Sequence, residues 1–287
     1  MTNVLITGGL GFVGRHLTAE LIRLGESPIL LVRENHLPMS KPNVRFLHLG
    51  ELEEFAKTEG IDCVINLAGF YTMDDAPDSA AALIAANLTF PTAIASILHR
   101  EGLVPTWIQA STFMQHVEAS EFDPACLYAS TKEAMLKVLK HFENKGFRIV
   151  NIILPHIYGD NDGRGKLLER LIASAKSGDL VQLSSGNQLF DLVHVSDVVD
   201  CLVQAMHIRE SNEFQLTSRK VFTIREVVEN IKSSSPNGLS VTYDQNLDRP
   251  RDTFQKWIVR PNPEWWTEKF NLNGWINEQF KPIEFNK

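Results

Sequence analysis

Residues 4–14, VLITGGLGFVG, open the chain with a pattern on which the reading of the remaining sequence rests. An apolar run predicts a buried strand, and glycines then recur at every third position as Gly8, Gly11 and Gly14. Leucines spaced four and three apart follow on one face of a predicted helix. In such a unit the first glycine permits a tight turn, the second lets the backbone approach a pyrophosphate, and the third lets the helix pack on the strand. The stretch therefore predicts a dinucleotide site at a helix N-terminus and not a plain glycine-rich surface turn.

The same alternation of apolar strands and helices continues through the first half of the chain. It indicates a Rossmann-type α/β fold, with a doubly wound parallel sheet buried on both faces. We expect residues 1–158 to form the NAD(P)-binding domain, with residues of about 188–216 returning to it, and residues 159–287 to form mainly a smaller C-terminal substrate-binding subdomain. The strands are predicted at 4–6, 27–32, 44–49, 63–67, 106–110 and 148–154, and the main helices at 79–99, 127–145, 166–176, 195–207 and 223–233.

Composition excludes several classes of protein. Acidic residues outnumber basic ones 35 to 28, which gives a formal net charge of −7 and argues against a nucleic-acid partner. The three cysteines are far apart and have no metal-ligand spacing, so we expect neither a disulfide framework nor a metal site. We find no signal-peptide pattern and no apolar run of about 20 residues, so we expect a cytoplasmic protein without a membrane segment.

The end of the second predicted strand indicates which dinucleotide is bound. Many NAD-binding proteins place an acidic residue there for the ribose 2′-hydroxyl. Here the strand ends in Arg33, and a guanidinium suits the 2′-phosphate of NADP. Glu34 follows directly and would serve a hydroxyl instead. We therefore expect NADP(H) in preference to NAD(H), with NAD(H) as the alternative.

Two further features point to acid–base chemistry. Tyr128 and Lys132 are four residues apart and lie on one face of a predicted helix. We expect the ammonium to lower the pKa of the phenol from its usual value of about 10, so that the pair can exchange a proton with a carbonyl or an alcohol. Thr112 ends the fifth strand, where its hydroxyl could hydrogen-bond the same substrate oxygen. Taken singly, these are also the marks of a half-buried tyrosine, a solvated lysine and an ordinary strand end.

The order of glycine turn, strand-end hydroxyl and Tyr-x-x-x-Lys resembles the extended short-chain dehydrogenase/reductase family over almost the whole chain. The resemblance implies Thr112, Tyr128 and Lys132 as catalytic residues and a homodimer formed by the helices at 79–99 and 127–145. Besides Tyr128 and Lys132, it implies as cofactor-binding residues Gly8, Gly11, Phe12, Val13, Gly14, Arg33, Glu51, Leu52, Leu67, Ala68, Gly69, Asn87, Ala110, Pro155 and Ile157. It implies as substrate-binding residues Phe70, Thr112, His156, Lys166, Arg249 and Arg251.

Finer features favour one subgroup. Residues 154–162, LPHIYGDND, followed by Lys166, resemble the corresponding segment of CDP-abequose and CDP-paratose synthases, which reduce a 4-keto group on a nucleotide-linked deoxysugar. The related 4,6-dehydratases carry acidic residues after the catalytic threonine. Phe113 and Met114 stand there in this chain and cannot transfer protons. Many relatives hold a substrate phosphate with an arginine where this chain has Phe190, so Lys166, Arg249 and Arg251 are expected to supply the positive charge.

We therefore expect an NADPH-dependent reductase of a nucleotide-linked 4-keto-6-deoxysugar, of the kind used to build surface polysaccharides such as lipopolysaccharide. Three alternatives stay open. The first is an NAD-dependent nucleotide-sugar 4-epimerase, which would use the same residues and keep its cofactor bound. The others are a reductase of a different carbonyl compound and a non-catalytic NADP-binding sensor or scaffold.

Overall fold

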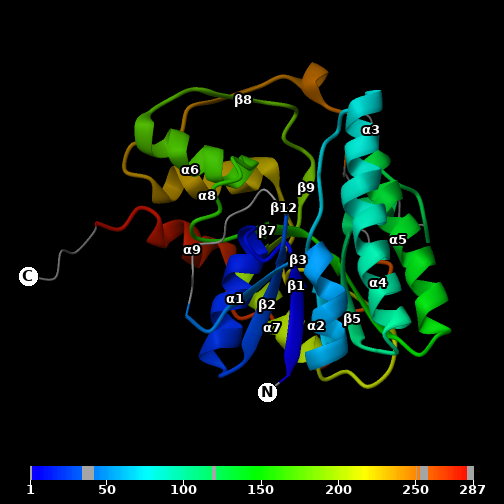
Figure 1. The fold of residues 1–287 in the computed structure, drawn as a ribbon. Helices are drawn as coiled ribbons and strands as arrows, with labels where there is room; N and C mark the ends of the chain where they lie inside the picture. Colours follow the sequence, from blue (N-terminus) through cyan, green and yellow to red (C-terminus); the bar gives the residue numbers. More distant parts are fainter. Residues whose placement is uncertain (1, 34–41, 118–120, 250, 253–257, 283–287) are drawn as a thin grey trace, which may run out of the picture.

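The computed structural model describes residues 2–33, 42–117, 121–249, 251–252 and 258–282. Its centre is a seven-stranded parallel sheet with the order β11-β6-β5-β4-β1-β2-β3 (Figure 1). The predicted Rossmann-type fold is thus confirmed. The strands are β1 (Asn3–Thr7), β2 (Ser27–Val32), β3 (Arg45–His48), β4 (Cys63–Asn66), β5 (Thr106–Thr112), β6 (Arg148–Leu154) and β11 (Asn212–Gln215).

Helices cover both faces of this sheet. Along β1, Val4 and Ile6 belong to a core shared with α1 (Phe12–Arg23) and α7 (Val195–Ala205). Leu5, between them, belongs to a second core. That core is shared with α2 (Leu52–Glu59), α4 (Phe90–Arg100) and α5 (Leu127–Glu143). Because successive strand residues point to opposite faces, an unbroken apolar strand is buried on both sides.

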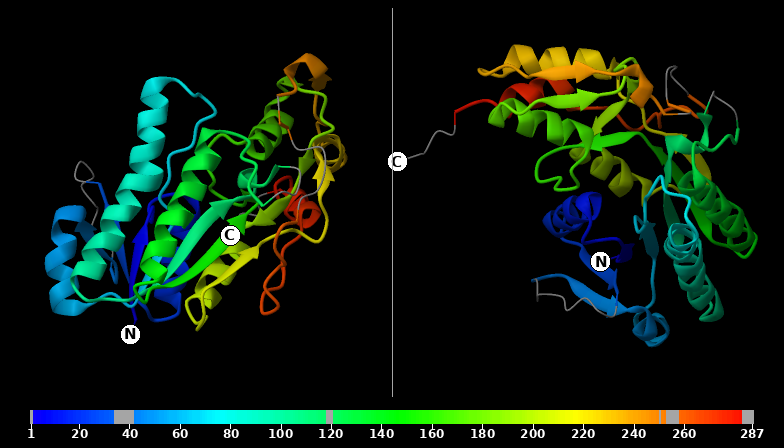
Figure 2. Two further views of the ribbon diagram at one scale, coloured as in Figure 1. Left: turned by 90° about the vertical axis from the view of Figure 1, so that its right-hand side faces the viewer. Right: turned by 90° about the horizontal axis from the view of Figure 1, so that it is seen from above.

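One long helix on the second face is interrupted by a wider turn. α3 (Pro77–Ile84) continues through the π-helical turn η2 (Ala85–Thr89) into α4, and the whole lies alongside α5 (Figures 1 and 2). The stretch Pro77–Arg100 has 24 residues and is long and apolar enough to cross a bilayer. As expected, this stretch is no unbroken apolar run of about 20 residues, because polar residues such as Asp78, Asn87 and Thr92 interrupt it. This helix packs in the second core through Ile94, Ala95 and Leu98, so it is a core helix and not a membrane span.

The C-terminal elements form a smaller unit at the carboxyl ends of the strands. A third core joins α6 (Leu167–Ser177), α8 (Ile224–Ser234) and α9 (Leu272–Glu278). Three short strand pairs complete it: β7 (His156–Tyr158) with β10 (Leu192–His194), β8 (Val181–Leu183) with β13 (Val241–Tyr243), and β9 (Leu189–Phe190) with β12 (Phe222–Thr223). The tail serves both units, since Trp266 packs in the core with α1 and Trp275 in the core with α6.

Candidate active site

A cleft of about 1610 Å³ lies between the carboxyl ends of the sheet and the C-terminal unit. It brings together most of the residues predicted from the sequence. These are Gly8, Gly11, Phe12, Val13, Gly14, Leu67, Gly69, Ala110, Thr112, Tyr128, Lys132, Pro155, His156, Ile157, Lys166 and Arg249. The predicted residues that do not line it are Arg33, Glu51, Leu52, Ala68, Phe70, Asn87 and Arg251.

The glycine turn has the tight geometry that the spacing predicts. Gly8 has φ of 68°, and a Cβ there would lie 2.8 Å from the backbone nitrogen of Ala68. A Cβ at Gly14 would lie 2.2 Å from the carbonyl oxygen of Gly8. Gly11 caps α1 without a side chain, so the first amide groups of the helix face the cleft with no side-chain acceptor. The turn therefore fits a dinucleotide pyrophosphate.

Buried polar side chains hold the neighbouring strand against this turn. The Thr7 hydroxyl donates to Asn66 Oδ1 at 2.6 Å and accepts from the Ala68 amide at 3.1 Å. Asn87, in the π-helical turn, accepts from the Phe70 amide at 2.9 Å and donates to the Phe70 carbonyl at 3.0 Å. Ala68, Phe70 and Asn87 thus shape the wall of the cofactor half without lining the cleft.

The residues predicted to lie near the adenine of the cofactor contact mainly neighbouring parts of the protein. Arg33 is exposed directly after β2, and Glu34 lies outside the described residues. One Glu51 carboxylate oxygen accepts from the His48 amide at 2.7 Å and caps the turn after β3. Leu52 is fully buried in the second core. The roles of these residues toward a cofactor stay predictions.

Tyr128 and Lys132 both lie in the cleft, but the electrostatics differ from the expectation. Lys132 Nζ is buried, donates to the Ala110 carbonyl at 3.1 Å, and lies 5.9 Å from the centre of the Tyr128 ring. Burial lowers the pKa of Lys132 to about 8. Burial, with smaller effects from Cys126 and Tyr71, raises the pKa of the Tyr128 phenol. The shift is opposite to the predicted one, because loss of solvation on burial dominates it.

Thr112 is held by a brace that the sequence did not reveal. Its backbone amide donates to Gln115 Oε1 at 3.0 Å, and Gln115 Nε2 donates to Glu133 Oε2 at 2.8 Å. Gln115 is completely buried, and Glu133 follows Lys132 on α5. The brace therefore links the strand end that carries Thr112 to the helix that carries Tyr128 and Lys132.

Beyond Thr112, apolar and aromatic side chains form one wall of the cleft. The His156 ring lies 4.7 Å from that of Phe113 and 4.4 Å from that of Phe190, measured between centroids. Met114 also lines this part of the cleft. Burial lowers the pKa of His156 to about 4, so the imidazole is neutral at physiological pH. This wall offers neither a charge nor a carboxylate to a bound ligand.

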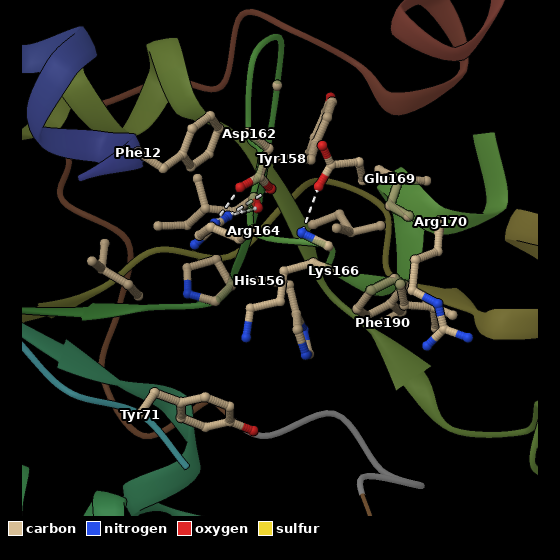
Figure 3. Close-up of a pocket in the computed structure, with 18 of the residues that line it drawn as sticks. Phe12, Tyr71, His156, Tyr158, Asp162, Arg164, Lys166, Glu169, Arg170 and Phe190 are labelled. Carbon is tan, nitrogen blue, oxygen red and sulfur yellow. Dashed lines mark hydrogen bonds and ion pairs between the residues drawn. The ribbon is translucent and has the colours of Figure 1, made fainter. Parts of the chain in front are cut away.

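Tyr71 is a cleft residue that the sequence analysis missed. Its ring packs edge-on against the Tyr128 ring, with 5.1 Å between centroids, and Lys166 Nζ, from the loop after β7, lies 4.3 Å from the centre of the Tyr71 ring (Figure 3). Phe70, the neighbour that was predicted, does not line the cleft. Alternation along an irregular loop has no period that could have distinguished the two residues.

Two charged residues of the cleft loops are already paired. Arg251, in a left-handed conformation with φ of 68°, forms an ion pair with Asp123. Arg164 pairs with Asp162 and lies over the Phe12 ring at 4.4 Å. In the described part of the chain, no group of three histidine, cysteine, aspartate or glutamate side chains could hold a metal ion.

Comparisons with known proteins agree with this arrangement. A model of the NAD dependent epimerase/dehydratase family matches residues 4–216. A CDP-abequose synthase of Yersinia pseudotuberculosis is 24% identical over 83% of this chain and 86% of its own length. A dTDP-6-deoxy-L-talose 4-dehydrogenase (NAD(+)) of Aggregatibacter actinomycetemcomitans is 21% identical over 89% of this chain and 98% of its own. The solved UDP-glucuronic acid 4-epimerase from Bacillus cereus, in complex with UDP-glucuronic acid and NAD, superimposes with a TM-score of 0.83 at 15% identity, covering 97% and 98% of the two chains.

Proposed function

The chain belongs to the NAD dependent epimerase/dehydratase family of NAD(P)-dependent enzymes, and from this premise we propose that it reduces the 4-keto group of a nucleotide-linked deoxysugar. The observation that carries the proposal is the composition of the cleft around Thr112. Tyr128 and Lys132 line it together with Phe113 and Met114, which directly follow Thr112 and cannot act as the acid and base of a dehydratase.

In this proposal the side chains of the protein donate the proton and orient the carbonyl oxygen of the substrate. A bound nicotinamide would supply the hydride. Tyr128, kept neutral by burial, donates its proton to the carbonyl oxygen as that oxygen becomes a hydroxyl. The Lys132 ammonium, 5.9 Å from the ring centre, then stabilises the phenolate that is left. The Thr112 hydroxyl orients the same oxygen.

The wall formed by Phe113, Met114, His156 and Phe190 supports a deoxysugar as the acceptor. A sugar hydroxyl placed against Phe113, Met114 or Phe190 would lose its hydrogen bonds to water without replacement, which costs about 1–3 kcal/mol for each buried hydroxyl. A methyl or methylene edge would instead bury apolar surface there.

A screen of NADPH oxidation against 4-keto-6-deoxysugar nucleotides with cytosine, uracil and thymine bases tests the proposal. We expect net oxidation of NADPH with at least one of them and formation of a 4-hydroxyl product. An absence of net oxidation with all of them, measured on protein that binds NADPH, would refute the reductase.

A nucleotide-sugar 4-epimerase is the second candidate, because the same three residues serve a hydride transfer in either direction and the solved 4-epimerase shares this fold. The two candidates differ in how they hold the cofactor. An epimerase recycles its dinucleotide and would be purified with NAD bound, whereas the reductase must exchange NADPH at every turnover. Cofactor released from the purified protein by denaturation and separated chromatographically distinguishes them.

Residues outside the cleft support the proposed choice of cofactor and the proposed dimer. The exposed Arg33 supports NADP(H) over NAD(H). One face of the long helix exposes apolar side chains, namely Ala81, Ala82, Ile84 and Ala85. This exposure supports a homodimer through that face. The product would serve the synthesis of a surface polysaccharide.

A further inference from the structure

We propose that Tyr71 is a positioning residue that holds the Tyr128 ring in place and shields it from water, and that Lys166 fixes Tyr71 from the C-terminal unit. This inference rests on the proposed function, in which Tyr128 donates the proton, and it names a residue that governs this donor. Tyr71 lies in the loop after β4, whereas Lys166 is the N-cap residue of α6. Both side chains line the cleft and project into it from these separate elements (Figure 3).

Contacts between rings fix the relation of Tyr71 to Tyr128. The two ring centroids are 5.1 Å apart and the ring planes meet at 87°, which is the edge-to-face arrangement that aromatic pairs favour. Lys166 Nζ lies 4.3 Å from the centre of the Tyr71 ring, within the range of a cation–π contact. The Tyr128 ring therefore packs against a second ring that is itself held by a cation from another part of the chain.

The loop that carries Tyr71 is anchored on both sides of this residue. The Phe70 amide donates to Asn87 Oδ1 at 2.9 Å, and the Phe70 carbonyl accepts from Asn87 Nδ2 at 3.0 Å. Asn87 Nδ2 also donates to Thr131 Oγ1 at 3.0 Å, on the helix that carries Tyr128. On the other side, Asp74 accepts two hydrogen bonds from the beginning of α3, at 3.1 and 2.5 Å. These bonds fix the backbone at Tyr71 relative to α5.

Tyr71 stands on the solvent side of the pair. Its side chain is 42% exposed, whereas Tyr128 is partly buried. In the described part of the chain, the titratable or charged side chains that face the two rings are Cys126, Lys132, Lys166 and Arg249, which follows η5 (Gln245–Leu247). Removing the Tyr71 ring leaves these groups in place and admits water to the Tyr128 phenol. Water favours the ionised form of a phenol, so the pKa of Tyr128 should fall.

A titration of the Tyr128 phenol tests this role without a substrate. Tyrosinate absorbance is followed against pH in Tyr71→Phe, which keeps a ring, and in Tyr71→Leu, which removes it. Each curve is compared with that of the same protein carrying Tyr128→Phe, so that the difference reports Tyr128 alone. Circular dichroism at each pH restricts the comparison to folded protein. We expect Tyr128 to ionise about one pH unit or more lower in Tyr71→Leu than in Tyr71→Phe, a tenfold change in the ionisation constant.

Tyr243 offers a matched control. Its ring also lies beneath a cation, with Arg225 Cζ 3.8 Å from its centre, but it does not line the cleft. Tyr243→Leu should therefore leave the titration of Tyr128 as it is in the unaltered protein.

Turnover gives a second measurement. With the 4-keto sugar nucleotide that the unaltered protein reduces fastest, kcat of Tyr71→Leu should fall about tenfold or more. Tyr71→Phe should restore most of the lost turnover, because the edge-to-face contact requires the ring and not the hydroxyl.

Equal titrations of Tyr128 in Tyr71→Leu and Tyr71→Phe, or no ionisation of Tyr128 in Tyr71→Leu before the protein unfolds, would overturn the role of Tyr71 and leave the proposed function intact. If the titration shifts as expected but no 4-keto sugar nucleotide is reduced, the proposed function fails and the shielding of Tyr128 by Tyr71 stands. The two failures are therefore distinguishable.

Discussion

Gln115 offers a test that depends on neither the identity of the substrate nor that of the cofactor. The substitution Gln115→Leu removes the acceptor of the Thr112 amide and the donor to Glu133. The Thr112 amide is then left buried without that partner, which costs about 1–3 kcal/mol. Glu133 keeps its ion pair with Lys137, at 3.0 Å, so its loss is smaller. We expect a decrease of about 2–4 kcal/mol in the free energy of unfolding.

Urea denaturation followed by circular dichroism measures this difference, with Gln245→Leu, at an exposed position of η5, as the matched control. Gln115→Glu adds a diagnostic, because it keeps the acceptor but sets two carboxylates against each other. We therefore expect Gln115→Glu to destabilise the protein as well, although it keeps an acceptor for the Thr112 amide. A change below about 0.5 kcal/mol in Gln115→Leu, the size usual for a surface substitution, would refute the brace.

Four further predictions concern the cleft and its surroundings. Tyr128→Phe should lower turnover about 10²- to 10⁴-fold while the Kd for NADPH, from fluorescence titration, stays the same; unchanged turnover would remove Tyr128 from the mechanism. Between pH 8 and 10.5 the unfolded chain keeps a proton on Lys132 that the folded chain has released. The free energy of unfolding of the unaltered protein should therefore rise with pH relative to that of Lys132→Met. Parallel pH profiles of the two proteins would contradict this. Arg33→Gln should weaken NADPH binding about tenfold or more and leave NADH binding unchanged, whereas equal losses for both would exclude contact with the 2′-phosphate. Ile84→Glu should convert the proposed dimer to a monomer in light scattering, and an unaltered mass would place any dimer contact elsewhere.

Much of the fold could be predicted because its signals are local. Strands buried on both faces are continuous apolar runs, and the glycine turn requires its residues in a fixed order, as the 2.2 Å approach of a Gly14 Cβ to Gly8 shows. Tyr128 and Lys132 could be paired because four residues on a helix always place side chains on one face. The small strand pairs β7–β10, β8–β13 and β9–β12 escaped prediction, since two or three residues carry too little pattern.

The sequence established the Rossmann-type architecture, the glycine turn and the order of Thr112, Tyr128 and Lys132, because the spacing of residues along one element carries that information. The structure alone established that burial raises the pKa of Tyr128, that Gln115 accepts from the Thr112 amide and donates to Glu133, and that Tyr71 and Arg170 line the cleft. Each of these depends on burial or on contacts between elements distant in sequence: α5 encloses the Tyr128 phenol with the loop after β4, and α6 brings Arg170 to the cleft. Desolvation and pairing are properties of the folded surroundings of a side chain, and residue spacing does not contain them.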